Sequence, residues 1–148
     1  MRKVVFIIFT AVIALAGCTL VHRTTSGPEA DYQHAALLAK ENKYREAISI
    51  CNKVAADSPH SQLGGDALFE AAYLSIFHDN PHKDYGQAMA GFDEYLKQYP
   101  DHPKAQAARS WHDVLKSFLD VRKENERLNK SIEELKKLDI RHEERRKK

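Results

Sequence analysis

The sequence predicts an all-α protein, and three observations support this fold class. After residue 29 the apolar residues recur at intervals of three and four, the period of helices that face a core. No stretch of the sequence shows the sustained alternation of apolar and polar residues that a half-buried strand requires. Two of the predicted helices also match each other at a constant offset. We therefore expect stacked helical pairs.

The first predicted pair occupies the segment before Pro59. Its first helix covers residues 30–41, and residues 42–43 form a turn. Its second helix covers residues 44–56 and ends at Ser58, because a residue that precedes proline disfavours the helical region.

The second predicted pair follows Gly64 and Gly65, which we expect to break the chain. Its helices cover residues 66–77 and 85–98, and residues 79–81 (Asp-Asn-Pro) separate them.

A last helix is predicted to open with Asp101 as N-cap and Pro103 in its first turn. Four apolar residues share one face of this helix and should pack on the helix at residues 85–98: Ala105, Ala108, Trp111 and Leu115.

A 41-residue offset relates the second and fourth predicted helices. At corresponding positions, each helix has a small residue where two helices approach and larger residues that fill the groove between them. A proline follows each helix and closes the unit. The pairs are Tyr44 and Tyr85, Ala47 and Ala88, Cys51 and Phe92, Val54 and Tyr95, and Pro59 and Pro100. Repeats of this length in helical pairs are typical of solenoid proteins.

This pattern resembles the second half of a tetratricopeptide repeat, and residues 42–48 (Asn-Lys-Tyr-Arg-Glu-Ala-Ile) match that family closely. The first helices match less well, since Asp31 stands where the family prefers tryptophan. An unrelated pair of helical hairpins would give the same fold class. The resemblance covers residues 30–100 and implies a concave groove that holds a partner segment. The candidate groove residues are Tyr32, Gln33, Lys40, Glu70 and Tyr73.

The chain begins like an export signal. Arg2 and Lys3 precede thirteen uncharged, mostly apolar residues, 4–16. That length suits a signal peptide and falls short of the roughly 20 apolar residues that span a bilayer.

The sequence Leu15-Ala16-Gly17-Cys18 resembles the lipobox of bacterial lipoproteins. The resemblance implies that a signal peptidase recognises the first three residues, cleaves before Cys18, and leaves covalent lipid on its thiol. A simple secretory signal and an uncleaved short membrane anchor are the alternatives. In such lipoproteins, an aspartate directly after the cysteine often signals retention in the inner membrane. Here that residue is Thr19, which favours the outer membrane, with the inner membrane as the alternative.

The expected organisation has four parts. These are a signal peptide (1–17), a lipidated tether (18–29), a tetratricopeptide-like helical domain (30–121) and a basic C-terminal helix (122–148).

The charge balance argues against a nucleic-acid partner. The precursor has 23 Lys and Arg against 21 Asp and Glu, and removal of Arg2 and Lys3 leaves 21 against 21. A neutral chain lacks the basic surface that nucleic acids require. The charge is uneven, since residues 19–121 hold 10 basic and 14 acidic residues and residues 122–148 hold 11 and 7.

The C-terminal segment carries the pattern of a coiled coil. Spacings of three and four alternate through Trp111 and Val114 into a predicted seam of Phe118, Val121, Asn125, Leu128, Ile132 and Leu135. Asn125 would select the register of a dimer. The alternative is a single exposed helix that frays past residue 138. The functional interpretations are a homodimer, a coil with another protein, or contact with anionic lipid.

The sequence shows no recognisable catalytic or metal-binding constellation. His78 and His82 are four residues apart, but Asn80-Pro81 keeps them off one helix face, and His102 and His112 have no evident partner. We therefore expect no enzyme, no metal and no cofactor beyond the lipid on Cys18.

With Cys18 lipidated, Cys51 remains alone, and we expect it to pack as a small hydrophobic residue on an apolar helix face. A Cys18–Cys51 disulfide would become possible only if the lipobox were absent.

The leading hypothesis is an envelope adaptor that binds an unidentified protein in assembly or signalling. The resemblance extends to the repeat lipoproteins of the β-barrel assembly machine, although this chain is much shorter. Residues 134–140 are also similar to the end of a lipoprotein that accompanies a quorum-sensing histidine kinase. A coiled-coil spacer, a homodimer and a sensor-kinase partner are the alternatives.

Overall fold

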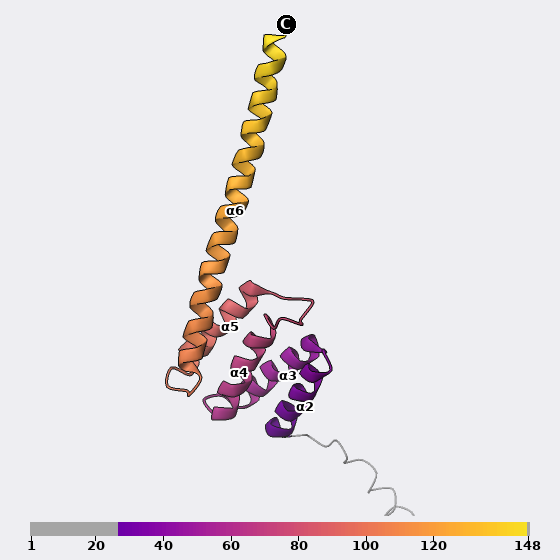
Figure 1. Ribbon diagram of the computed structural model, residues 1–148. Coiled ribbons are helices and arrows are strands. Elements are labelled where there is room, and N and C mark those ends of the chain that lie inside the picture. Colours follow the sequence, from indigo (N-terminus) through magenta and orange to yellow (C-terminus); the bar gives the residue numbers. More distant parts are fainter. Residues whose placement is uncertain (1–26, 148) are drawn as a thin grey trace, which may run out of the picture.

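The computed structural model describes residues 27–147, and the predicted signal peptide and most of the tether lie outside this range. Five helices make up the described chain, labelled as in Figure 1: α2 (Pro28–Lys40), α3 (Tyr44–Asp57), α4 (Gln62–Leu74), α5 (Tyr85–Gln98) and α6 (Ala105–Arg146). Residues 27–147 contain no strand, so the all-α prediction is confirmed for them. Within the same range, no helix has the length and apolar character needed to cross a membrane.

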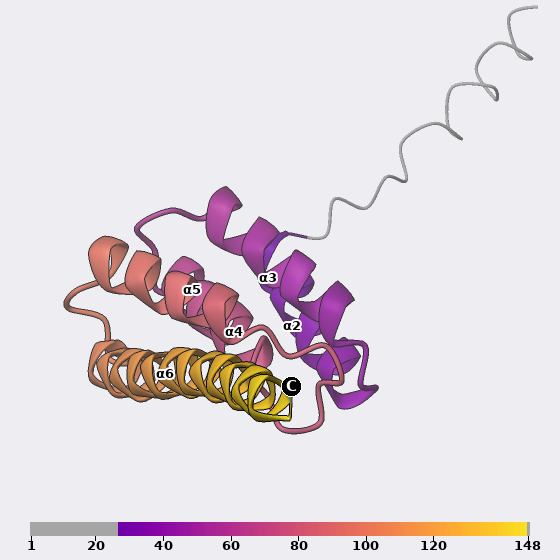
Figure 2. The same ribbon diagram turned by 90° about the horizontal axis from the view of Figure 1, so that it is seen from above.

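The helices stack in chain order. Each packs on its sequence neighbour, from α2 on α3 through α5 on α6, and α2 also touches α4. Seen along α6, the helices α3 and α5 occupy one side of the stack, and α2, α4 and α6 occupy the other (Figure 2). The chain therefore forms two helical hairpins followed by one long helix.

The 41-residue repeat is present in the backbone as well as in the sequence. The three central pairs are fully buried, with Ala47, Cys51 and Val54 in α3 and their counterparts Ala88, Phe92 and Tyr95 in α5 all at 0% exposure. The two helices also end alike, at Ser58 (φ −131°, ψ 54°) and at Tyr99 (φ −132°, ψ 55°). Each of these residues precedes a proline, which explains the shared non-helical conformation.

The predicted chain break at Gly64 and Gly65 is wrong, because both glycines lie in the first turn of α4. The Oγ atom of Ser61 accepts a hydrogen bond from the Gly64 N–H at 2.9 Å and caps the helix. A Cβ on Gly64 would collide with the Ser58 carbonyl oxygen and lie 2.7 Å from Tyr99 Oη. The glycines thus allow α4 to pass close to two loops.

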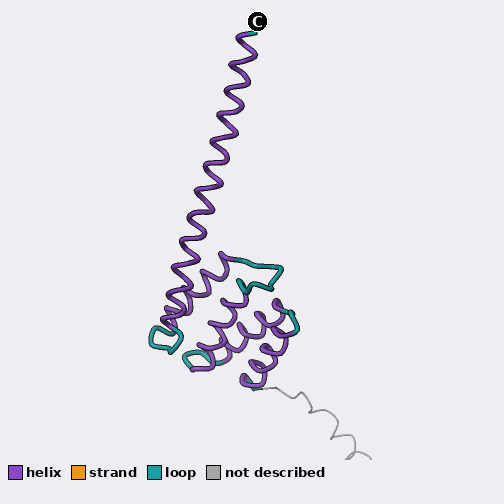
Figure 3. The backbone as a smooth tube through the Cα atoms, viewed as in Figure 1, coloured by secondary structure: helices purple, strands orange, loops and turns teal. Residues whose placement is uncertain are grey.

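The connection between α4 and α5 spans residues 75–84 (Figure 3). Asn80 is 2% exposed and organises it. Its Nδ2 donates to the Leu74 carbonyl at 2.9 Å, and its Oδ1 accepts from the His82 N–H at 2.9 Å. At the end of the loop, Asp84 caps α5 by accepting from the Gln87 N–H at 2.8 Å.

The predicted start of the last helix is also wrong, since α6 begins at Ala105 and no side chain caps it. The preceding residues form a turn around His102, which was predicted to lack a partner. Its Nδ1 lies 2.7 Å from Tyr95 Oη, and its Nε2 lies 3.2 Å from the Gln62 carbonyl oxygen. His102 therefore joins this turn to α5 and to the start of α4, and a capping aspartate is not needed.

The first part of α6 packs on α5 as predicted. Ala105, Ala108 and Leu115 are buried in one cluster with Phe92, and Trp111 packs partly buried against it. From Val121 to Lys147 every described side chain is exposed except the half-buried Ser131. The helix nevertheless continues to Arg146, so the predicted boundary at residues 121 and 122 falls inside one unbroken helix (Figure 1).

Candidate functional site

A groove of about 610 Å³ lies between α3 and α5, with α4 as its floor. Small residues create it, because Ala55 and Ala56 on α3 and Ala90 and Gly91 on α5 leave the space between these helices unfilled. Gly91 also lets α5 approach α4, since a Cβ there would lie 3.0 Å from the Cβ of Ala72. The same small residues thus bring the helices together and hollow the surface between them.

The floor of the groove is apolar and its rim is polar. The floor includes Leu68, Ala71 and Ala72, which are all buried. The rim includes the exposed amides Asn52 on α3 and Gln87 on α5. Amide side chains both donate and accept hydrogen bonds, as the backbone of a bound peptide would require.

One carboxylate, Glu94, is the single ionisable side chain among the residues that line the groove. Its Oε1 accepts a hydrogen bond from Gln98 Nε2 at 2.9 Å. The lining supplies neither a histidine, a cysteine nor a second carboxylate. The arrangement therefore suits binding, and it lacks the paired groups that acid–base or nucleophilic catalysis uses.

Three of the predicted groove residues lie on the other side of α4, on the face shared with α2 and α6. Tyr32 and Glu70 are half-buried and interact electrostatically. Burial, with added repulsion from Glu70 and Asp66, raises the pKa of Tyr32 to about 12. Burial also raises the pKa of Glu70, against the opposing charge of Lys104. Tyr32 and Glu70 are thus near enough to interact through their charges, but neither lines the groove.

Tyr73 packs against α6 instead of facing a groove. Its ring centroid lies 5.7 Å from that of Trp111 and 5.8 Å from that of Phe77. The next ring along α4, Phe69, has Lys104 Nζ 5.2 Å from its centroid. These rings pack on one another, so this face is built of interhelix contacts.

The other two predicted groove residues, Gln33 and Lys40, are on α2 and do not line the groove. Both are exposed on α2, and Gln33 Nε2 donates to Glu29 Oε1 of its own helix at 3.4 Å. None of the five predicted groove residues therefore lines the groove between α3 and α5. The available signal was the cluster of small residues in the second helix of each pair, at 55–56 and at 90–91.

Cys51 occupies the interior as predicted. It is free, 0% exposed, and packed in a cluster with Ala35, Val54 and Ala67. Burial raises the pKa of its thiol to about 12, so it remains protonated at neutral pH. Elsewhere in the described chain, no three His, Cys, Asp or Glu side chains gather where they could hold a metal ion.

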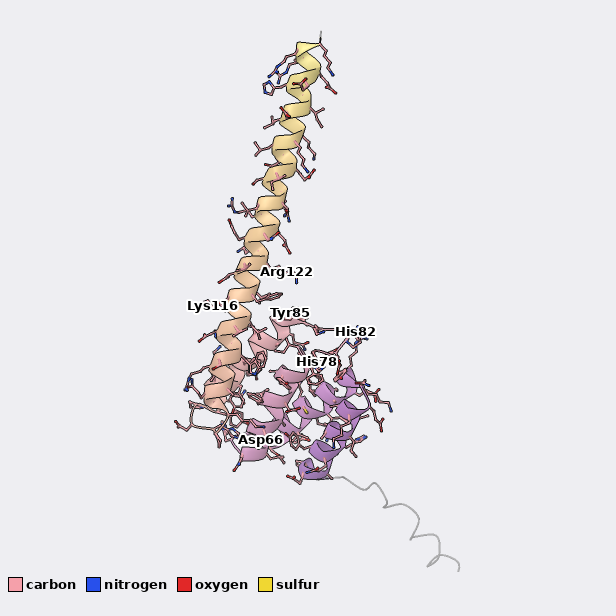
Figure 4. The ribbon with its side chains drawn as sticks, viewed as in Figure 1. Asp66, His78, His82, Tyr85, Lys116 and Arg122 are labelled. Atoms are coloured by element: carbon pink, nitrogen blue, oxygen red, sulfur yellow. The ribbon has the colours of Figure 1, made fainter. Side chains whose placement is uncertain are left out.

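The predicted coiled-coil seam is exposed on α6. The exposed fractions are 44% for Phe118, 69% for Val121, 49% for Leu128, 48% for Ile132 and 64% for Leu135, and Asn125 is exposed as well. Phe118 has a neighbour in the body, since its ring centroid lies 4.7 Å from that of Tyr85, which Figure 4 labels beside α6. Beyond Phe118 the seam residues stand free of the helical body.

The predicted lipidation site lies outside the described residues. This applies to Leu15, Ala16, Gly17 and Cys18, so lipid attachment at Cys18 stays a prediction from the lipobox pattern.

No family model and no curated protein matches the sequence, and no solved structure matches the fold.

Proposed function

We propose that this protein is a membrane-anchored periplasmic lipoprotein that acts as an interaction adaptor. It holds a segment of another envelope protein in the groove formed by α3, α4 and α5. The observation that carries the proposal is this groove, with its apolar floor and amide rim. The lipobox at Leu15-Ala16-Gly17-Cys18 supports the membrane anchor, and Thr19 supports the outer membrane.

The chemistry of the rim favours an extended segment as the bound partner. A helix satisfies its own backbone hydrogen bonds, whereas an extended peptide offers free N–H and C=O groups. Asn52, Gln87 and Gln98 lie where they would pair with such groups, and Ala71 and Ala72 give room for apolar side chains. We therefore expect an extended segment with small or medium apolar residues.

The net charge of the helical body further restricts which segments it can bind. Residues 27–121 carry 9 basic and 14 acidic residues, a net charge of −5. An acidic body repels acidic segments, so the bound segment should be neutral or basic.

Photocrosslinking in intact cells tests the proposal. A photoreactive amino acid at Gln87, on the exposed rim, should yield an adduct with a specific envelope protein. The double substitution Ala56→Arg with Ala90→Arg should abolish the adduct, because both positions are exposed and line the groove. Far-UV circular dichroism should show that this variant retains its helices.

The matched control is Ala36→Arg, an exposed alanine on α2 that does not line the groove. This variant should retain the adduct. The adaptor proposal fails if Gln87 captures nothing above background, or if filling the groove leaves capture unchanged. Capture of a sensor kinase would assign the adaptor to signalling, and capture of an outer-membrane assembly factor would assign it to assembly.

A further inference from the structure

The second half of α6 presents an apolar stripe that the described chain leaves uncovered. Val121 and Leu135 at its ends are 69% and 64% exposed, and Leu128 and Ile132 between them are about half exposed. Together with Asn125, these four apolar side chains recur at spacings of four and three on one face of the helix, as in a helix that pairs with another.

We propose that a second copy of this chain covers the stripe, in a parallel, in-register, two-stranded coiled coil over residues 121–135. This pairing is separate from the groove and goes beyond the adaptor function, because it makes the adaptor bivalent.

The residue types in the stripe fit two strands. Alternating spacings of three and four place Asn125 and Ile132 in one kind of layer, and Val121, Leu128 and Leu135 in the other. In heptad terms these are the a and d positions. A β-branched residue at a with leucine at d favours a parallel dimer over larger assemblies.

Asn125 fixes the orientation of the pair. In a parallel, in-register coil, a positions face a positions, so Asn125 meets Asn125 of the second copy and the two amides form hydrogen bonds. In an antiparallel coil over residues 121–135, a positions face d positions, and Asn125 would lie against a leucine with its amide buried and unpaired. In the single chain its Oδ1 accepts only from Asn129 Nδ2 of the same helix, at 2.8 Å.

The charged residues beside the stripe are compatible with a second copy. Several are already paired within the helix, at N–O distances of 3.2 Å for Arg122–Glu126, 2.6 Å for Arg127–Glu124 and 2.9 Å for Lys136–Glu133. In the parallel register, Glu124 faces Asn129 of the second copy, and Ser131 faces Lys136 of the second copy. Like charges therefore do not meet across these positions.

The helical body leaves room for the partner. Leu115 is buried against α5, and successive helical residues are rotated by about 100°, so the face of Val114 and Val121 points away from the body. Phe118, in contact with Tyr85, marks the edge between the two faces. Two copies can thus pair with their bodies on the outside.

Disulfide crosslinking of the full-length chain in intact cells tests the pairing. Val121→Cys should form a disulfide-linked dimer of twice the chain mass. Lys123→Cys, on the opposite face of α6, should not. An antiparallel coil that overlaps most of residues 121–135 would place residue 121 opposite residue 132 or beyond, which separates the two copies of residue 121 by about 16 Å or more along the axis. A disulfide spans only roughly 7 Å between Cα atoms. The remaining thiol, Cys51, is buried and will not interfere.

A second variant guards against a misleading negative. Leu128→Glu with Ile132→Glu should abolish the dimer, measured by light scattering of the detergent-extracted chain, whereas Lys130→Glu should retain it. The proposal is overturned if the chain is monomeric, or if Val121→Cys crosslinks to a different protein instead of to itself. Ala90→Arg, which fills the groove, should leave the Val121→Cys dimer intact, so failure of the adaptor and failure of the dimer are distinguishable.

Discussion

Gly64 shows how a single missing side chain shapes this fold. The position lies within a helix, where alanine would ordinarily be more stable than glycine by roughly 1 kcal/mol. Here a Cβ would collide with the Ser58 carbonyl oxygen and crowd Tyr99 Oη. We expect Gly64→Ala to lower the free energy of unfolding by about 1–3 kcal/mol, as overpacked sites do. Urea denaturation followed by circular dichroism measures this.

The same substitution at Gly86 is the control. It lies in the first turn of α5, and a Cβ there would meet only Asp84 Oδ1 at 3.4 Å. Gly86→Ala should leave stability unchanged or raise it. Equal losses at both positions would show that crowding around Gly64 is not the cause.

Cys51 makes stability depend on pH at the alkaline end. Burial raises the thiol pKa to about 12 in the folded chain, whereas an unfolded cysteine ionises near pH 8.5. The unfolded state therefore loses its proton first, and the free energy of unfolding falls as pH rises from about 8.5 towards 12. We expect Cys51→Ala to be less stable at pH 7 but to decline less between pH 8.5 and pH 11. Urea midpoints at several pH values measure both effects.

Tyr32 and Tyr95, whose pKa values burial also raises to about 12, remain in the variant. Their shared contribution cancels in the comparison. Parallel pH curves for the two proteins would refute the role of the Cys51 thiol.

At the scale of helices, the sequence predicts most of the architecture. The helices at residues 44–56 and 85–98 agree with α3 and α5 within a residue, because their apolar periodicity is strong and proline follows each end. The start of α4 could not be predicted from Gly64 and Gly65, because their helical conformation depends on Ser61 as a cap and on packing by Tyr99 and His102. Contacts between segments 40 residues apart leave little local signal.

The two halves of α6 should respond differently to deletion. Among residues 122–147 every side chain is exposed except the half-buried Ser131, whose Oγ donates to the Arg127 carbonyl of the same helix at 3.2 Å. We expect removal of residues 122–148 to change the free energy of unfolding of the body by less than about 0.5 kcal/mol, the range of surface changes. Removal of residues 105–148 exposes Phe92 and Tyr95 and should unfold it.

Thermal unfolding of both truncated chains, followed by circular dichroism, makes the comparison. If the shorter deletion destabilised the body as strongly as the longer one, the second half of α6 would have to pack on the body in solution.

At the scale of the whole molecule, small residues in the second helix of each pair are the sequence's one signal of the groove, and they do not specify its location. The location depends on the relative placement of three helices. The small residues that line the groove come from three segments at least 15 positions apart in the sequence, at 55–56, 71–72 and 90–91. The family resemblance instead indicated α2 and α4, where Tyr73 and Trp111 already pack together. For the proposed membrane attachment, by contrast, the argument depends on the sequence alone, because Cys18 lies outside the described residues.

The proposed attachment through Cys18 gives the last prediction. Cys18→Ala should abolish incorporation of labelled palmitate in growing cells, because the thiol carries the lipid. Cys51→Ala, which removes the buried cysteine, should retain the label. Labelling that persists in Cys18→Ala would overturn the lipoprotein assignment.

The direction of α6 determines how far the protein would extend from a membrane to which it is anchored as proposed. The helix ends at the opposite end of the molecule from the start of α2 (Figure 1). Its 42 residues span about 63 Å at 1.5 Å per residue. With the proposed lipid at Cys18, the bodies stay near the bilayer while the paired tips stand several nanometres above it. Residues 136–147 hold six basic and three acidic residues, and pairing doubles that charge. The paired C-terminal ends of α6 would then present a positively charged surface to a layer of the envelope that the groove does not reach.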